Sequence, residues 1–407
     1  MMPSAPHHHR QIVPAGQRPT WAEIDLAALA ANFHVVQGQV GPEIKVMAVV
    51  KSDAYGHGAV ECARRLATEG AAWFGVATPE EAIELRQSGI AQPILCLGGF
   101  WEGQEAACLQ QRLTPMVYRL DLVEALNGAA GDRGVIADVH VKIDTGMGRL
   151  GVRFDEVAEF AQALKRLRNI RVDGLMTHLA AADDPSHERL TTKQIQRFED
   201  AVRVFRELGY NPTYRHLANS AALFAQPSAW GNMVRPGGVL YGLWRDVLAP
   251  SLEAGAVSDP PGPVRSASGR AQTGLLRPVM SLRSRITLLK WVPAGETVGY
   301  GCTYEAARKT LVATLPIGYN DGYLRSLSNC GRVIVRGTYA PVIGRVSMDL
   351  VLIDATSIPG VELGDIVTLM GQDNGLNVPA EDIAKPSGTI SYEVTCGISS
   401  RVPRIHG

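Results

Sequence analysis

Short apolar runs alternate with amphipathic stretches between about residues 44 and 242. Eight such runs can be counted, at residues 44–51, 72–78, 93–99, 114–118, 137–145, 172–180, 214–220 and 233–242. Several are apolar without alternation, which is typical of strands buried on both faces in a parallel sheet. Eight strand-then-helix units in a row predict an α/β fold, a closed (β/α)8 TIM-like barrel. A doubly wound open sheet is the alternative, but the sequence has no obvious switch point.

Two of the intervening stretches show helical spacing most clearly. Apolar residues fall on one stripe in 155–168 and again in 191–209. The second helix is expected to begin at Thr191 or Thr192, because threonine is a good N-cap, and to stop near Gly209.

After about residue 275 the hydrophobic period changes to two. Strand-like segments separated by glycine-containing turns occur at 310–318, 332–337, 340–347, 349–356 and 365–371. They predict a mostly-β C-terminal domain over residues 275–407. Residues 249–274 are rich in Pro, Gly, Ser and Ala and predict a linker or insertion.

The barrel is assigned to residues 20–248, preceded by a flexible leader at residues 1–19. The segment 20–26 alternates in polarity, so it is either part of the barrel or a strand of the C-terminal domain.

Composition narrows the function classes. Forty basic residues balance forty acidic ones, so neither a nucleic acid nor an anionic membrane is expected as the main partner. There is no apolar run of 18 residues and no secretory signal. Six cysteines lie far apart without a CxxC pair, which favours free thiols in a reducing cytoplasm and no metal site.

Chemistry in a barrel is carried at the carboxyl ends of its strands. Polar residues at those predicted ends are Lys51, Tyr55, Lys142, Arg149, His178, His216, Ser220, Arg235 and Gly237. Lys51 closes a buried strand, where a partly desolvated amine favours Schiff-base chemistry. The alternative is a lysine that only reaches to the rim.

Loops after the seventh and eighth strands of barrels often bind phosphate. Ser220 and Gly237 stand at those two places. A lysine and a phosphate site at one barrel mouth together suggest pyridoxal phosphate. Arg149 is suited to clamp a carboxylate, and Lys142 needs a partner or a modification if it is buried. His178 alone is equally consistent with a core histidine.

At these residues the sequence resembles the alanine racemase family, over nearly all of the chain from about residue 20. The motifs are AVVKSDAYGHG (48–58), KIDTGMGRLGV (142–152), THLAAAD (177–183), HLANSAA (216–222), MVRPGGVLYG (233–242), VGYGCTY (298–304), IGYNDGY (317–323), GRVSMD (344–349) and ISYE (390–393). One departure is Ser-Asp at 52–53, where the family commonly has Ala-Asn. The resemblance implies a pyridoxal-phosphate-dependent amino-acid racemase that makes D-alanine for peptidoglycan.

The resemblance also implies roles for individual residues. Lys51 would hold the cofactor covalently and act as one base, with Tyr300 from the partner subunit of a homodimer as the opposing base. The phosphate would be held by Tyr55, Ser220, Gly237 and Tyr392.

Further roles follow in the same way. Arg235 would face the pyridine nitrogen, and His178 would link Arg235 to Tyr300. Arg149 would contact the cofactor's phenolic oxygen and the substrate carboxylate. Met348 of the partner would donate its backbone N–H to the substrate. Lys142 corresponds to a lysine that is carbamylated in many members.

Three rival functions stay open at this stage. A racemase for serine, lysine or arginine differs only in pocket size, which the sequence does not fix. A barrel amino-acid decarboxylase is disfavoured by Arg235, because decarboxylation profits from a protonated ring nitrogen. A non-catalytic pyridoxal-phosphate carrier would lack the β-rich domain.

Overall fold

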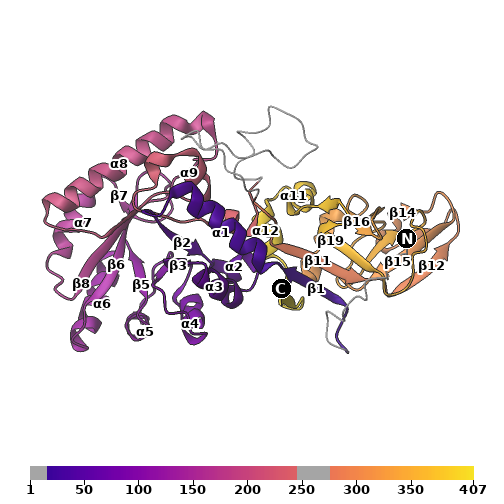
Figure 1. Ribbon diagram of the computed structural model, residues 1–407, viewed down its shortest axis with the longest axis horizontal. Coiled ribbons are helices and arrows are strands. Elements are labelled where there is room, and N and C mark those ends of the chain that lie inside the picture. The colour runs from indigo at the N-terminus through magenta and orange to yellow at the C-terminus, as the bar shows by residue number, and fades with distance from the viewer. Residues whose placement is uncertain (1–15, 245–275) are drawn as a thin grey trace, which may run out of the picture. The chain divides into compact units, whose positions relative to one another are not determined.

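The computed structural model describes residues 16–244 and 276–407, which form two compact units (Figure 1). One unit is Leu26–Arg277, and the other combines the described residues up to Asp25 with Pro278–Gly407. The predicted linker at 249–274 and the first fifteen residues of the predicted leader lie outside the described residues. The second unit resumes at Pro278, three residues after the predicted start at 275.

Leu26–Arg277 contains a nearly closed barrel of eight parallel strands, as the sequence predicts. In spatial order the strands are β10 (Met233–Val234), β2 (Lys45–Val49), β3 (Trp73–Val76), β4 (Ile94–Cys96), β5 (Thr114–Val117), β6 (Ala137–Asp144), β8 (Ile170–Met176) and β9 (Tyr214–His216). The short β7 (Val152–Arg153) pairs with β6 outside this order. The ring closes where Asn232 N–H donates to the Arg215 carbonyl at 3.1 Å and Arg235 N–H donates to the Ala218 carbonyl at 3.0 Å.

Helices follow the strands around the outside of the barrel (Figure 1). They are α2 (Lys51–Gly56), α3 (Ala59–Thr68), α4 (Pro79–Gln87), α5 (Glu105–Gln110), α6 (Leu120–Asp132), α7 (Val157–Leu164), α8 (Glu188–Glu207) and α9 (Ser220–Ala225). Within the described part of the chain, β10 is followed only by the 3-10 helix η3 (Gly238–Tyr241). No helix in that part is long and apolar enough to cross a bilayer.

The helix α1 (Leu26–Val40) precedes the first barrel strand and packs against both α3 and η3. Its buried Asn32 fixes it there: the side-chain amide donates to the carbonyls of Leu240 and Arg277, and its oxygen accepts the Arg277 N–H. The helix therefore covers the place beside β10 where an eighth helix is expected in a regular barrel.

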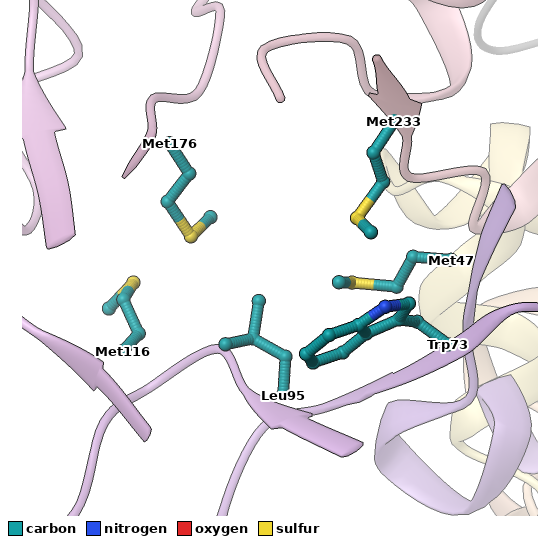
Figure 2. Close-up of a cluster of buried hydrophobic side chains, with 6 residues drawn as sticks. All are labelled: Met47, Trp73, Leu95, Met116, Met176 and Met233. Atoms are coloured by element: carbon teal, nitrogen blue, oxygen red, sulfur yellow. The ribbon is translucent and has the colours of Figure 1, made fainter. Parts of the chain in front are cut away.

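The barrel interior is filled by a layer of long apolar side chains (Figure 2). Its members come from six different strands and point toward one another: Met47, Trp73, Leu95, Met116, Met176 and Met233. Methionine is flexible and fills irregular gaps, so four of them can close the space around one indole. The barrel interior is therefore a packed core.

The second unit is built on a mostly antiparallel sheet. Its strand order is β17 (Thr338–Pro341), β16 (Arg332–Val335), β19 (Ile366–Asp373), β11 (Met280–Arg285), β1 (Thr20–Ile24) and β21 (Arg404–His406), with β20 (Leu376–Val378) paired to β19. The strand β1 pairs antiparallel with β11 and parallel with β21. Of the two places that the sequence leaves open for 20–26, the structure thus has β1 in this unit.

The remaining elements of the second unit are small. A three-stranded sheet has the order β12 (Leu288–Val292), β15 (Thr310–Leu315) and β18 (Val351–Asp354), and β13 (Thr297–Val298) pairs with β14 (Tyr304–Glu305). Two short helices, α11 (Ala380–Ala384) and α12 (Ser391–Cys396), lie near the end of the chain. All six cysteines are free.

Two local predictions are corrected by the structure. The second predicted helix begins at Glu188, not at Thr191 or Thr192, because a 3-10 turn at Pro185–His187, capped by Asp184, leads directly into it. It ends at Glu207, next to the predicted stop at Gly209. The predicted leader at 1–19 also ends too late, since Arg18 donates to both carboxylate oxygens of the buried Asp321, at 2.7 and 2.6 Å.

The Arg18–Asp321 pair generates a stability prediction. Arg18→Ala leaves the buried carboxylate of Asp321 with the longer Arg401 contact, at 3.4 Å, and the Gly318 N–H, at 3.0 Å. Loss of one partner of a buried pair is expected to lower the free energy of unfolding by about 3 kcal/mol in urea titrations. The matched control is Arg119→Ala, which breaks the exposed pair with Asp121 and should lower the free energy of unfolding much less. Equal losses in the two variants would contradict the anchoring role of Arg18.

Candidate active site

Lys51 follows β2 after one residue and begins the short element α2, which is a left-handed turn and not a regular α-helix. The four residues after it, Ser52 to Tyr55, all have left-handed backbone angles, with φ between 53° and 55°. None of them is glycine, and a left-handed conformation costs an ordinary residue about 1–2 kcal/mol. The surrounding structure must therefore hold this turn, and it thereby fixes where Lys51 and Tyr55 leave the backbone.

Two carboxylates hold the turn in place. Glu81, in the first turn of α4, accepts the Ser52 N–H at 2.7 Å and the Ala77 N–H at 2.6 Å, so it ties the Lys51 turn to the end of β3. Asp53 accepts the Ala59 N–H at 2.7 Å, at the start of α3. An asparagine oxygen can accept the same bond, which explains why the departure from the family's Ala-Asn is tolerated here.

Tyr55, Ser220 and Gly237 meet in the first unit. The Gly237 N–H donates to Ser220 Oγ at 2.9 Å. A Cβ at residue 237 would lie 2.3 Å from the Tyr55 hydroxyl, so only glycine lets these groups approach. The Tyr55 ring packs on Tyr241, with 5.0 Å between ring centroids. Two hydroxyls and a backbone nitrogen thus lie close together and form a polar cradle, and groups of this kind can bind an anion.

Arg235 is buried directly after β10, and its terminal nitrogens are fully used. One donates to His216 Nδ1 at 2.9 Å and to the His216 carbonyl at 2.7 Å, and the other donates to the carbonyls of Thr177 and Leu217. Every acceptor is neutral, and burial lowers the pKa of Arg235 to about 9. Among the described residues the Nε–H is the one guanidinium donor that has no partner.

The cationic side chains at this mouth affect one another. Burial, then the charges of Arg235 and Arg149, lower the pKa of the Lys142 amine well below its ordinary value. Burial also lowers the pKa of His178, with further contributions from Arg235, Lys142, Arg149 and Lys51 in that order. Both shifts favour the neutral forms of Lys142 and His178.

Asp144 is the nearby carboxylate that favours the charged form of Lys142, but its main role is elsewhere. Its Oδ1 accepts the N–H groups of Gly146, Met147 and Gly148, which shapes the loop that carries Arg149. The Arg149 side chain itself is exposed.

The structure also reveals a residue that the sequence analysis missed. His140, on β6, contacts His216 through Nδ1 at 2.9 Å, so Arg235, His216 and His140 form a line into the barrel. The imidazole bonded to Arg235 is thus His216. Among the described residues, His178 makes no hydrogen bond to Arg235 and is coupled to it through charge alone. The polar alternation of His140, Lys142 and Asp144 is the sequence signal that could have identified His140.

The other predicted site residues belong to the second unit. Tyr300 opens the 3-10 helix η5 (Tyr300–Cys302) and is 73% exposed, and Met348 is 52% exposed. Tyr392 lies in α12 and is partly buried. The first unit thus brings together Lys51, Tyr55, Lys142, His178, Ser220, Arg235 and Gly237, with Arg149 on a neighbouring loop.

Comparisons with known proteins agree over both units. A family model described as the alanine racemase N-terminal domain matches residues 24–244, and one described as the C-terminal domain matches residues 279–406. An alanine racemase of Geobacter sulfurreducens is 45% identical over 392 residues, covering 96% of this chain and 97% of that protein. Another, of Halothermothrix orenii, is 42% identical over 387 residues, covering 95% and 96%.

Solved structures give the same result. The alanine racemase of Streptomyces lavendulae superposes with a TM-score of 0.85 at 35% identity, covering 97% of this chain and 98% of that one. That of Bacillus anthracis, solved with bound L-Ala-P, gives a TM-score of 0.85 at 32% identity, covering 97% and 96%.

The buried histidines generate a pH prediction. Burial lowers the pKa of His140 to about 3 and that of His216 well below its ordinary value. The unfolded chain therefore takes up protons below about pH 6.5 while the folded chain does not, so the stabilisation is complete above that pH and is lost as pH falls toward 3. One such histidine should account for roughly 2 kcal/mol of lost unfolding free energy between pH 8 and pH 5.

Urea titrations of the cofactor-free protein at pH 5 and pH 8 measure this difference. His140→Leu should reduce the pH dependence by roughly that amount, relative to the parent chain. His187→Gln, which removes an exposed histidine, is the control and should change the pH dependence less than His140→Leu does. An identical pH dependence in the parent chain and in His140→Leu would contradict the neutral, buried state of His140.

Proposed function

The chain belongs to the alanine racemase family, and we propose that its own residues perform a two-base interconversion of L-alanine and D-alanine at the barrel mouth. The family depends on pyridoxal phosphate, and alanine racemisation is the activity of its relatives. When bound, the cofactor supplies an electron sink that makes the Cα proton of the amino acid acidic. The observation that carries the proposal is the meeting of an anion cradle and a buried arginine beside Lys51.

The residues at the mouth suit the cofactor at both of its ends. The phosphate would be held by the Tyr55 and Ser220 hydroxyls and the Gly237 backbone, where any larger residue would meet Tyr55. Tyr392 would add a further hydroxyl. The Nε–H of Arg235 would face the pyridine nitrogen, because the other four donors are already used. A guanidinium donates without giving up its proton, so that nitrogen stays unprotonated.

Two bases on opposite faces of Cα allow one group to remove the proton and the other to return a proton on the opposite face. Lys51 would hold the cofactor and move the proton on one face, and Tyr300 would do so on the other. The exposure of Tyr300 and Met348 on the second unit supports their use by a neighbouring chain, since a catalytic phenol is not expected to face solvent. We therefore propose a homodimer in which each active site takes Tyr300 and the Met348 N–H from the partner.

Arg149 would contact the substrate carboxylate and the cofactor's phenolic oxygen. We propose that Lys142 is carbamylated, because a neutral buried amine can react with carbon dioxide and the product is an anion. That anion would lie among the cations Arg235 and Arg149, where a negative charge is favourable. His178, whose neutral form is favoured by burial and by those same charges, would link Arg235 to Tyr300 in the assembled dimer.

The relatives favour alanine over the other substrates and reactions considered from the sequence, because the similar curated proteins are named alanine racemase. The match to the C-terminal family domain also argues against a carrier made of a barrel alone. We propose that the enzyme works in the cytoplasm and that its D-alanine is used in peptidoglycan.

Lys51→Ala tests the assignment of the cofactor-holding lysine. We expect loss of the visible absorbance of the bound cofactor and loss of alanine racemisation, because no other amine stands at this turn. Lys45→Ala is the matched control, since Lys45 lies exposed at the other end of β2. An unchanged visible spectrum in Lys51→Ala would refute the assignment.

Tyr300→Phe tests the opposing base. We expect proton removal from L-alanine to slow far more than removal from D-alanine, measured by hydrogen isotope exchange in the two directions, because only one face loses its base. Equal losses in both directions would count against two opposed bases.

The same variant tests the shared site. In a heterodimer of Lys51→Ala and Tyr300→Phe chains, one site has both substitutions and the other has neither. A random mixture should therefore recover about a quarter of the parent activity. No recovery in a mixture shown to contain heterodimers would mean that Tyr300 acts within its own chain.

A further inference from the structure

Behind Arg235 lies a line of two imidazoles that reaches into the closed barrel. Arg235 donates to Nδ1 of His216 at 2.9 Å, and Nε2 of His216 lies 2.9 Å from Nδ1 of His140. All three side chains are buried, and the two histidines are completely so. Such groups are expensive to keep in a core, so their arrangement calls for a reason.

The hydrogen-bond directions in this line are fixed by chemistry. A guanidinium nitrogen is only a donor, so His216 must accept through Nδ1 and carries its proton on Nε2. That proton is donated to His140, which must then accept through its own Nδ1 and carry its proton on Nε2. The His140 Nε2 has no hydrogen-bond partner among the described residues. Each ring therefore has a single tautomer, with every proton pointing away from the barrel mouth.

Packing holds the last ring where it can do this. The His140 ring lies 5.2 Å from the ring of Trp73, a member of the apolar layer of Figure 2, and 5.8 Å from Tyr214. A Cβ at Gly174 would lie 2.6 Å from His140 Nδ1, so the neighbouring strand must have glycine there. This packing fixes the orientation of the His140 ring, so that Nδ1 is the nitrogen that faces His216.

We propose that His140 is a positioning residue for Arg235, acting through His216 as a tautomer lock. If His140 did not accept, the His216 proton could move to Nδ1 and would then face the guanidinium, donor against donor. The guanidinium of Arg235 would then rotate away from His216. Its Nε–H would no longer be directed at the place proposed for the pyridine nitrogen. The inference rests on the role of Arg235 in the proposed function, but the tautomers themselves do not.

The number of unpaired buried N–H groups distinguishes this role of His140 from simple space filling. With His140 present, its own Nε2–H is unpaired in the core. With leucine at 140, the unpaired N–H would be that of His216. The number of unsatisfied donors is the same, so the lock can be removed with little effect on stability.

The first test is the tautomeric state. In protein labelled with ¹⁵N-histidine, with and without cofactor, NMR should show both rings neutral with the proton on Nε2 from pH 8 to pH 5. His140→Leu and His216→Leu spectra assign the two signals. A proton on Nδ1 of either ring, or a doubly protonated ring in this range, overturns the proposal without touching the racemase assignment.

The second test compares two replacements of nearly equal size. Asparagine keeps an oxygen where His140 Nδ1 accepts, and leucine does not. His140→Leu should lower kcat at least about tenfold, with KM within about threefold and an unchanged melting temperature. His140→Asn should restore kcat to within about threefold of the parent chain.

Met116→Leu is the control for disturbance of the barrel interior and should leave kcat unchanged. The proposal is overturned if leucine and asparagine lower kcat equally, if leucine leaves kcat unchanged, or if the loss of kcat only follows a loss of melting temperature. Failure of the parent chain to racemise alanine would be a different result, against the proposed function itself.

Discussion

The structure depends on keeping one guanidinium inside the barrel mouth without a carboxylate beside it. Arg235 joins the ends of β8, β9 and β10 through neutral acceptors, so the charge is solvated by the fold but not neutralised by it. An uncompensated buried cation attracts anions and repels protons. The lowered pKa values of Lys142, His178 and His216 are the consequence of the same burial and the same charge. A mouth of this kind is prepared for a ligand with an anionic end and an unprotonated ring nitrogen.

The Lys51 turn determines the directions in which the side chains of Lys51 and Tyr55 leave the backbone. Four consecutive left-handed residues would not be stable in an isolated peptide. They persist because Glu81 and Asp53 tie the turn to α4 and α3, and because the cradle at Gly237 receives Tyr55. The strain is thus located where the side chains of Lys51 and Tyr55 leave the backbone, and strain of this kind is common at functional sites.

Much of this could be predicted from the chain, for identifiable reasons. The eight barrel strands are predicted because their apolar runs are continuous, and Lys51, Ser220 and Gly237 are candidates because they stand at the predicted carboxyl ends of those strands. Glu81 illustrates what is missed: Thr78 to Glu81 reads as an ordinary capping pattern, yet the carboxylate reaches Ser52, which no local pattern shows. His140 was missed because the alternation of polar residues at 140, 142 and 144 does not show which side of the strand faces the barrel interior. The start of α8 was misplaced because its preceding 3-10 turn makes the threonine cap unnecessary.

The place of β1 has a consequence for how the protein is made. Thr20 pairs with Ser284, 264 positions later, so the main sheet of the second unit needs the first strand of the chain to wait while the barrel is synthesised. Contacts of such long range form slowly, and the barrel can complete its own local contacts first. A fragment that begins at Pro278 would lack a central strand and would expose the edges of β11 and β21 to other chains. The β-rich unit is therefore the one at risk of aggregation until β1 has paired with β11.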